Sequence, residues 1–165
     1  PIGKSKYEPD RTDKAKELMD LSGTGENADI EIPFDCVVAA EANDAAEKRT
    51  LPASEVPADM SIFDLGKATI DHYISVIEQS QMIVWNGPIG LYEMKNFAEG
   101  TQRIAEAVAA ATKKGAVTIV GGGDTIDFHA HAGLPLSAYT FVSTGGGAML
   151  EFISGKPMPA LETLR

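Results

Sequence analysis

Apolar runs that end in glycine-containing turns alternate along this chain with stretches of helical spacing. The runs occupy residues 36–40, 60–66, 82–85, 116–120 and 139–142. Continuously apolar strands are typical of parallel sheets that are covered by helices on both faces. The alternation therefore predicts an α/β fold, with a three-layer, mostly parallel sheet and right-handed crossovers.

Two segments between these runs carry apolar residues at helical spacing. The first predicts a helix over residues 67–79, and the second predicts an alanine-rich helix over 97–114 that stops at Gly115. We also expect a polar surface helix at 9–22, a short helix at 125–132, a helix that starts within 143–151, and a long surface loop at 41–58 with short pieces of extended chain.

Three glycine-containing segments follow directly after three of the predicted strands. They are residues 86–90, 121–125 and 143–147. The carboxyl ends of parallel strands lie at one edge of a sheet, and ligands bind there in open α/β folds. The sequence thus predicts that these three segments converge on a ligand site.

The segment 121–125 reads Gly-Gly-Gly-Asp-Thr and precedes a predicted helix. The first N–H groups of a helix lack partners within the helix and point toward an anion, and glycine lets a phosphate approach the backbone. Asp124 would be repelled by bare phosphate but suits a magnesium ion bound to it. The alternative is an ordinary turn in which Asp124 caps the helix.

The other two segments are open to a functional and a structural interpretation. Three consecutive glycines at the start of a helix in 143–147 each cost about 0.5–1 kcal/mol relative to alanine, so an anion on their N–H groups is favoured over a tight strand–helix crossing. There, Ser143 or Thr144 is a candidate cap. The segment 86–93 taken alone favours a plain turn, because Asn-Gly-Pro is a strong turn signal and Glu93 suits a solvated helix start.

Charge and composition limit the possible partners. The net charge is −10, which argues against a nucleic-acid partner but leaves phosphorylated small molecules possible. No apolar run approaches the roughly 18–20 residues of a membrane span. The single cysteine, Cys36, excludes an internal disulfide and fits a reducing cytoplasm.

Taken together and in this order, the three motifs resemble the phosphoglycerate kinase family. They are residues 84–90 with Glu93, then 121–125, then 143–148, and the ending at 155–161 is similar as well. The resemblance implies a glycolytic phosphoryl transfer between 1,3-bisphosphoglycerate and MgADP, which gives 3-phosphoglycerate and MgATP. It also implies a two-domain hinged enzyme whose C-terminal, Rossmann-like domain binds ATP or ADP with Mg²⁺.

The resemblance assigns roles to individual residues. Asp124 would help to hold Mg²⁺, Thr125 would contact a nucleotide phosphate, and Glu93 would bind the ribose hydroxyls. The full set implied for nucleotide binding is Asn86, Gly87, Ile89, Glu93, Gly122, Gly123, Asp124 and Thr125. The N–H groups of Gly145, Gly146 and Gly147 would face the phosphoryl group in transfer, with Thr144 nearby, which makes these glycines the catalytic candidates.

The sequence departs from the family pattern in two respects. Ile62 stands where the family has a glycine near the adenine pocket. The chain also begins part-way through the nucleotide domain, so we expect residues 1–165 to be a partial C-terminal domain that lacks its first strands and the phosphoglycerate-binding domain. We therefore expect these residues alone to be inactive, whereas the intact protein would be a cytoplasmic monomer.

Two alternatives remain open. The chain could be a nucleotide-binding module without catalysis, or an unrelated α/β domain whose glycines are merely turns. Binding of MgADP would distinguish the kinase from the unrelated α/β domain. The residues that precede Pro1 would distinguish the kinase from the non-catalytic binding module.

Overall fold

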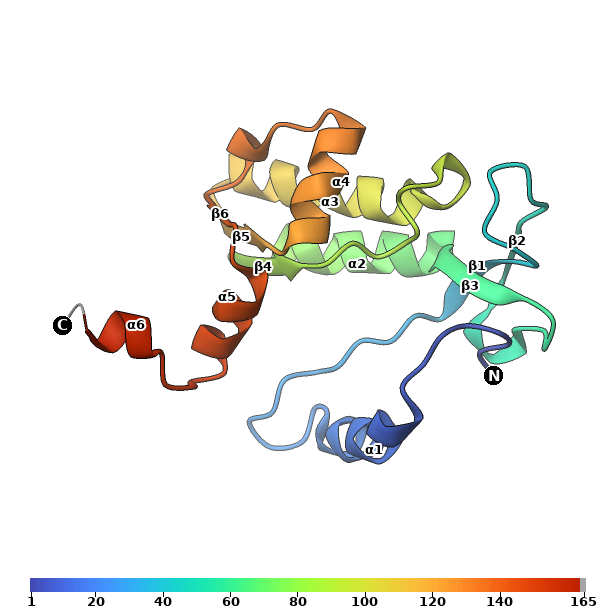
Figure 1. Ribbon diagram of the computed structural model, residues 1–165, viewed down its shortest axis with the longest axis horizontal. Coiled ribbons are helices and arrows are strands. Elements are labelled where there is room, and N and C mark those ends of the chain that lie inside the picture. The colour runs from blue at the N-terminus through green and yellow to red at the C-terminus, as the bar shows by residue number, and fades with distance from the viewer. Residues whose placement is uncertain (164–165) are drawn as a thin grey trace.

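The computed structural model describes residues 1–163, and Figure 1 shows their arrangement. Along the chain, the helices and strands are α1 (Thr12–Leu21), β1 (Asp35–Ala39), β2 (Arg49–Pro52), β3 (Ser61–Leu65), α2 (Lys67–Gln79), β4 (Met82–Asn86), α3 (Glu99–Lys113), β5 (Val117–Gly121), α4 (Gly123–Ala132), β6 (Phe141–Ser143), α5 (Gly146–Ile153) and α6 (Pro159–Glu162). The α/β class is as predicted, and the expected loop at 41–58 contains β2.

The strands of the described residues form two separate sheets. One is parallel, with the order β4-β5-β6, and the other is antiparallel, with the order β2-β1-β3. The apolar runs at 36–40 and 60–66 therefore lie outside the parallel sheet. The connection between β1 and β3 contains no α-helix, and parallel neighbours need a long crossover, usually a helix, so these two strands pair in the antiparallel sense.

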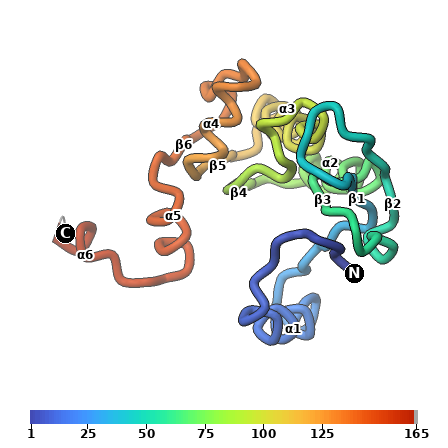
Figure 2. The backbone as a smooth tube through the Cα atoms, turned by 45° about the vertical axis from the view of Figure 1, so that its right-hand side comes forward, coloured from blue at the N-terminus to red at the C-terminus, as the bar shows by residue number. Residues whose placement is uncertain are grey.

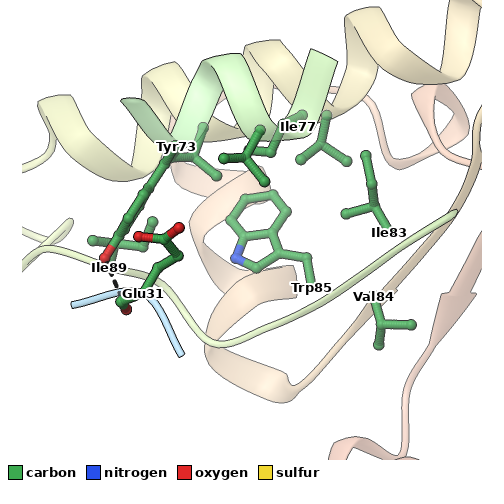
Figure 3. A pocket seen from close by; sticks show the side chains of 10 residues that line it. Glu31, Tyr73, Ile77, Ile83, Val84, Trp85 and Ile89 are labelled. Carbon is green, nitrogen blue, oxygen red and sulfur yellow. Dashed lines mark hydrogen bonds between the residues drawn. The ribbon is translucent and has the colours of Figure 1, made fainter. Parts of the chain in front are cut away.

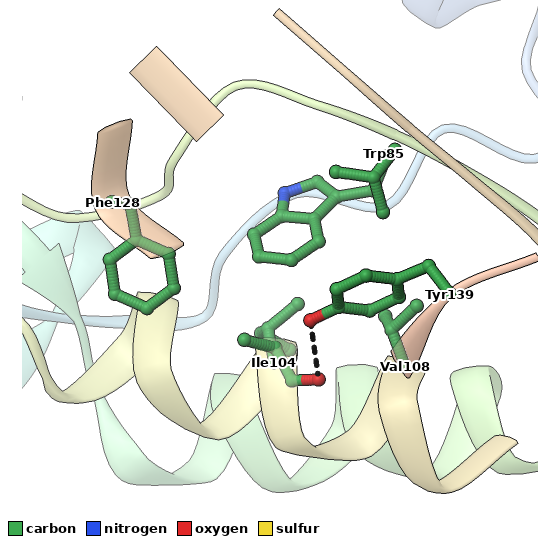
Figure 4. Close-up of a cluster of buried hydrophobic side chains, with 7 residues drawn as sticks. Trp85, Ile104, Val108, Phe128 and Tyr139 are labelled. Carbon is green, nitrogen blue, oxygen red and sulfur yellow. Dashed lines mark hydrogen bonds between the residues drawn. The ribbon is translucent and has the colours of Figure 1, made fainter. Parts of the chain in front are cut away.

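Helices α2, α3 and α4 cover one face of the parallel sheet. Trp85 of β4 and Val120 of β5 point to this face and pack against Ile104 and Val108 of α3 and Phe128 of α4 (Figure 4). On the opposite face, apolar residues are exposed, among them Met82 at 65% and Phe141 at 60% of full residue exposure. The core of the described residues therefore lies between the sheet and these three helices.

A buried polar contact ties α4 to this core. Nδ1 of His129 lies 2.6 Å from the Thr125 carbonyl, and Nε2 lies 2.7 Å from the Tyr139 hydroxyl. That hydroxyl donates to the Ala105 carbonyl of α3 at 3.3 Å (Figure 4), and burial raises the pKa of Tyr139 to about 12. His129 is thus a structural residue that fixes the helix following the glycine run.

An apolar hollow of about 350 Å³ lies beside β4, which is an edge strand of the parallel sheet. Tyr73 and Ile77 of α2 form one wall and Trp85 lies at its base, with Glu31 at the mouth (Figure 3). The segment that carries Glu31 joins α1, which stands apart from the sheets, to β1 (Figure 2). Among the described residues, no helix is long and apolar enough to cross a membrane.

Truncation of the core between α3 and the sheet should destabilise the fold. Ile104 is 4% exposed and belongs to the cluster around Trp85. Ile104→Ala should lower the free energy of unfolding by about 2–5 kcal/mol, because it removes buried methyl groups and leaves a cavity. Urea denaturation checks this, with exposed Glu106→Ala on the same helix as the control. Equal midpoints for the two variants would contradict this assignment of the core.

Candidate functional site

The register of the parallel sheet brings three strand ends into one row. Asn86 of β4 lies opposite Gly121 of β5, and Gly121 lies opposite Ser143 of β6. All three residues end their strands, so the segments that follow them leave the sheet at the same edge. The predicted convergence of 86–90, 121–125 and 143–147 is therefore confirmed.

Glycine is required where these segments touch. A Cβ on Gly146 would lie 2.6 Å from the Gly122 Cα and 3.0 Å from the Asn86 Oδ1. A Cβ on Gly122 would also lie 3.0 Å from that oxygen, and the φ of Gly122 is +98°, a conformation that glycine adopts readily. Side chains are thus excluded between the starts of α4 and α5, and the two backbones meet beside the Asn86 amide.

A hydrogen-bonded link fixes the first loop to the second. The Gly87 N–H donates to the Thr125 hydroxyl at 2.7 Å, and the Trp85 Nε1–H donates to the Gly87 carbonyl at 2.7 Å. Thr125 is fully buried, so its side chain joins the loops from inside α4. By contrast, a Cβ on Gly123 or Gly147 would meet no atom within 4 Å, which leaves these two positions open to a ligand.

The helices begin at glycines and not at the predicted caps. α4 starts at Gly123 and its N-cap is Gly122, so Asp124 lies in the first turn and the interpretation of Asp124 as the cap is wrong. α5 starts at Gly146 and its N-cap is Gly145, so neither Ser143 nor Thr144 occupies the cap position. Neither cap residue makes a side-chain hydrogen bond to its helix, so the first N–H groups of α4 and α5 are left without a side-chain cap.

Carboxylates gather beside the start of α4. The Tyr92 hydroxyl donates to Oδ2 of Asp127 at 2.8 Å. Burial, this bond and the charges of Asp127, Glu93 and Asp124 raise the pKa of Tyr92 to about 12. Glu93 and Asp124 are both exposed. They therefore lie close enough to the same phenol to act on its ionisation.

The carboxylates in the described part of the chain do not form an all-protein metal cage. No group of three His, Cys, Asp or Glu residues is placed there to hold a metal. Mg²⁺ commonly binds through one or two carboxylates together with substrate phosphates and water. The exposed Asp124, in the first turn of a helix whose N–H groups suit phosphate, fits that kind of site.

A second hollow, of about 590 Å³, lies on the other side of the 86–93 segment. Its walls come from β3, from residues 89–91 and from the start of the chain, where Lys4 and Lys6 contribute. The Ser5 hydroxyl accepts the Ile62 N–H at 2.9 Å, which holds the start of the chain against β3. Ile62, which departs from the family pattern, lines this hollow. No local sequence signal places Lys4 beside residue 62.

The remaining predicted residues, Ile89 and Glu93, lie on the turn after Gly87. The Ile89 N–H donates to the Thr101 hydroxyl of α3 at 3.1 Å, and Ile89 borders both hollows. The structure therefore brings Asn86, Gly122 and Gly146 close together and joins Gly87 to Thr125, while Ile89 borders the hollow beside β3. Glu93 is exposed and acts on Tyr92.

Comparison with known proteins gives a consistent result. The family profile described as phosphoglycerate kinase matches residues 1–156. Phosphoglycerate kinases from Mycobacterium sp. (strain KMS) and Prosthecochloris aestuarii are 37% and 42% identical to this chain over 99% of its length, which is 39% and 41% of theirs. The phosphoglycerate kinase structure from Coxiella burnetii has a TM-score of 0.90 at 38% identity and covers 98% of this chain, which spans 41% of that one.

The two glycines at the start of α5 should respond differently to a methyl group. Gly146→Ala should lower the free energy of unfolding by about 1–3 kcal/mol, because its Cβ would press on the Gly122 backbone. Gly147→Ala is the matched control, since its Cβ meets no atom within 4 Å and alanine favours the helix. Thermal unfolding checks this, and equal loss in both variants would contradict the close approach.

Proposed function

Because this chain belongs to the phosphoglycerate kinase family, we propose that it supplies the nucleotide side of the phosphoryl transfer between 1,3-bisphosphoglycerate and MgADP. The products are 3-phosphoglycerate and MgATP. The chain spans about two fifths of the length of the curated relatives it matches. Residues 1–165 are accordingly assigned to the C-terminal nucleotide-binding domain, and phosphoglycerate binding to the rest of the intact enzyme.

The observation that carries this proposal is the contact of Gly122 with Gly146 beside Asn86. It sets the N-termini of α4 and α5 side by side at the carboxyl edge of the sheet. Both ends present backbone N–H groups and the positive end of a helix dipole, which suits the chain of phosphates on a nucleotide. A protein with a net charge of −10 can thus bind an anion without a basic cluster.

In this function, residues 122–125 at the start of α4 bind the metal and the phosphates, and residues 145–147 at the start of α5 contact the transferred phosphoryl group. Asp124 helps to hold Mg²⁺, which neutralises phosphate charge when it is bound, and Gly122, Gly123 and Thr125 line the phosphates. The N–H groups of 145–147 stabilise charge on the phosphoryl group in transfer. In phosphoryl transfer, such positioning and charge stabilisation account for most of the catalysis.

The 86–93 segment serves the nucleoside in this proposal. Asn86, Gly87 and Ile89 flank the nucleotide, and the exposed carboxylate of Glu93 accepts hydrogen bonds from the ribose hydroxyls. The intact enzyme is proposed to act in the cytoplasm as a monomer.

Magnesium-dependent binding tests the role of Asp124. In the full chain, Asp124→Ala should weaken ADP binding about tenfold, or about 1.4 kcal/mol, when Mg²⁺ is present. Without Mg²⁺ the variant should bind ADP no more weakly than the wild type, because the lost carboxylate acts through the metal. Titration calorimetry measures both, with exposed Asp20→Ala on α1 as the control. No difference between the two variants would favour a plain turn at 121–125.

Catalysis by residues 1–165 alone is a separate test. We predict that they form no ATP from 1,3-bisphosphoglycerate and ADP, because the partner that positions the acyl phosphate is assigned to the rest of the enzyme. A coupled assay of ATP formation measures this, and turnover by these residues would contradict it. The intact protein must be active in that assay, since MgADP binding without activity would identify a non-catalytic nucleotide-binding module.

A further inference from the structure

A carboxylate that the proposed chemistry does not use is buried next to residues 86–93, which are called the nucleotide segment below. Asp64 of β3 is 3% exposed. One of its oxygens accepts the Gly100 N–H, in the first turn of α3, at 2.9 Å, and the other accepts the Leu65 N–H at 2.8 Å. The carboxylate thus joins β3 to the amino end of α3, where the helix dipole favours negative charge.

Two glycines make room for this carboxylate. A Cβ on Gly100 would lie 2.2 Å from Oδ1 of Asp64, and a Cβ on Gly90 would lie 2.4 Å from the same atom. Gly90 belongs to the 86–93 segment, whereas Gly100 belongs to α3. The carboxylate therefore lies between the nucleotide segment and α3. A side chain on Gly90 or Gly100 would occupy the space that it needs.

The next residue of α3 holds the nucleotide segment directly. Thr101 is fully buried, and its hydroxyl accepts the N–H groups of Ile89 at 3.1 Å and Gly90 at 3.0 Å. The Leu91 N–H donates to the Phe63 carbonyl of β3 at 2.8 Å. Residues 89–91 are thus fixed on one side to α3 and on the other to β3, the two elements that Asp64 joins.

We propose that Asp64 is a positioning residue of the nucleotide site, which acts through Gly100 and Thr101 to hold residues 89–91 in place for the bound nucleotide. This inference rests on the proposed function. It adds to it a residue that contacts neither substrate nor metal, and whose charge state controls how tightly nucleotide is bound.

The environment of Asp64 makes this link sensitive to pH. Burial raises the pKa of Asp64 to about 6, although the hydrogen bonds from the Gly100 and Leu65 N–H groups lower it in part. Among the charges around it, Glu99 raises the pKa and Lys48 lowers it. Asp64 also lines the hollow of about 590 Å³, together with Lys4 and Lys6. Because the folded state holds this proton more tightly than the unfolded state, Asp64 stabilises the fold most at low pH, and this stability is lost as pH rises through about 6.

Nucleotide binding should change in the opposite direction. An ionised carboxylate accepts both N–H groups, whereas a protonated one carries a hydrogen on one oxygen that then opposes an N–H. Protonation therefore loosens the Gly100 or the Leu65 contact, and with it residues 89–91. A residue with a purely structural role would lower stability and affinity together, so opposite pH trends identify a positioning role.

The experiment compares MgADP affinity in the full chain and in Asp64→Asn across the pH range around 6, at saturating Mg²⁺. Asparagine mimics the protonated acid and does not titrate. The variant should bind about tenfold more weakly than the wild type well above pH 6, and the two affinities should converge well below it. The titration of ADP itself cancels in the ratio of the two affinities. In parallel, urea denaturation should show that the loss of stability between about pH 4 and 6 disappears in the variant.

Variants of Thr101 test the same link without altering Asp64. Thr101→Val removes the acceptor for Ile89 and Gly90, so it should weaken MgADP binding and abolish the pH-dependent ratio, and Asp64→Asn should then add nothing. Thr101→Ser keeps the hydroxyl and should restore both properties. Val108→Ala, in the buried second half of α3, is the control: it should lower stability, while its MgADP affinity relative to the wild type should be the same at every pH.

Three outcomes separate the two proposals. If the wild type binds MgADP and the ratio changes with pH as described, the inference holds. If the wild type binds but Asp64→Asn has the same affinity at every pH, or loses affinity in parallel with stability, the positioning role is overturned and the proposed function stands. If the wild type does not bind MgADP at any pH, the proposed function itself fails.

Discussion

The close approach of the Gly146 and Gly122 backbones is the constraint on which the rest of the site depends. A side chain on Gly146 would lie 2.6 Å from the Gly122 Cα, so α5 can start where it does only because it begins with glycine. This contact sets the starts of α4 and α5 at one edge of the parallel sheet. The cost of flexible glycines at a helix start, about 0.5–1 kcal/mol each, is offset by the geometry they permit.

Helix α3 connects this edge to the core of the protein. Its later turns contribute Ile104 and Val108 to the cluster around Trp85, while its first turn contributes Gly100 and Thr101 to the contacts of the nucleotide segment. The same tryptophan donates to the Gly87 carbonyl. A rigid core is therefore joined at two points to a loop that would otherwise be free to move, which is how a precise binding site is supported.

Electrostatically, the site relies on backbone dipoles more than on basic side chains. The chain carries ten more negative than positive charges, and Glu93, Asp124 and Asp127 all act on Tyr92. Such a surface repels free phosphate, and in the proposed function the charge of Mg²⁺ would offset this repulsion for a bound nucleotide. The N–H groups at the starts of two helices then supply positive potential without the flexibility of lysine or arginine.

Features that arise from neighbouring residues were predictable without the structure. Apolar runs predicted the strands β4, β5 and β6, and the glycine-rich segments after them predicted the convergence at Asn86, Gly122 and Gly146, because strand direction in βαβ units follows from the helices between them. The likeness of these motifs to a known family added the individual roles. The glycines at the start of α5 were expected, but α4 begins at Gly123, two residues before the predicted start, and the caps are Gly122 and Gly145. An acid or hydroxyl next to glycine also satisfies the local rules for a cap, so the sequence alone could not choose between them.

The pairing of segments that are distant in the chain depends on packing and could not be predicted in this way. The antiparallel pairing of β1 with β3 was not predicted, because an apolar run has the same composition in either sheet. Asp64 and Gly100 are 36 residues apart, and Lys4 reaches a hollow lined by Ile62 and Gly90. A carboxylate in an apolar strand gives no sign in the sequence that a helix end will satisfy it, because that partner is set by packing and not by sequence spacing.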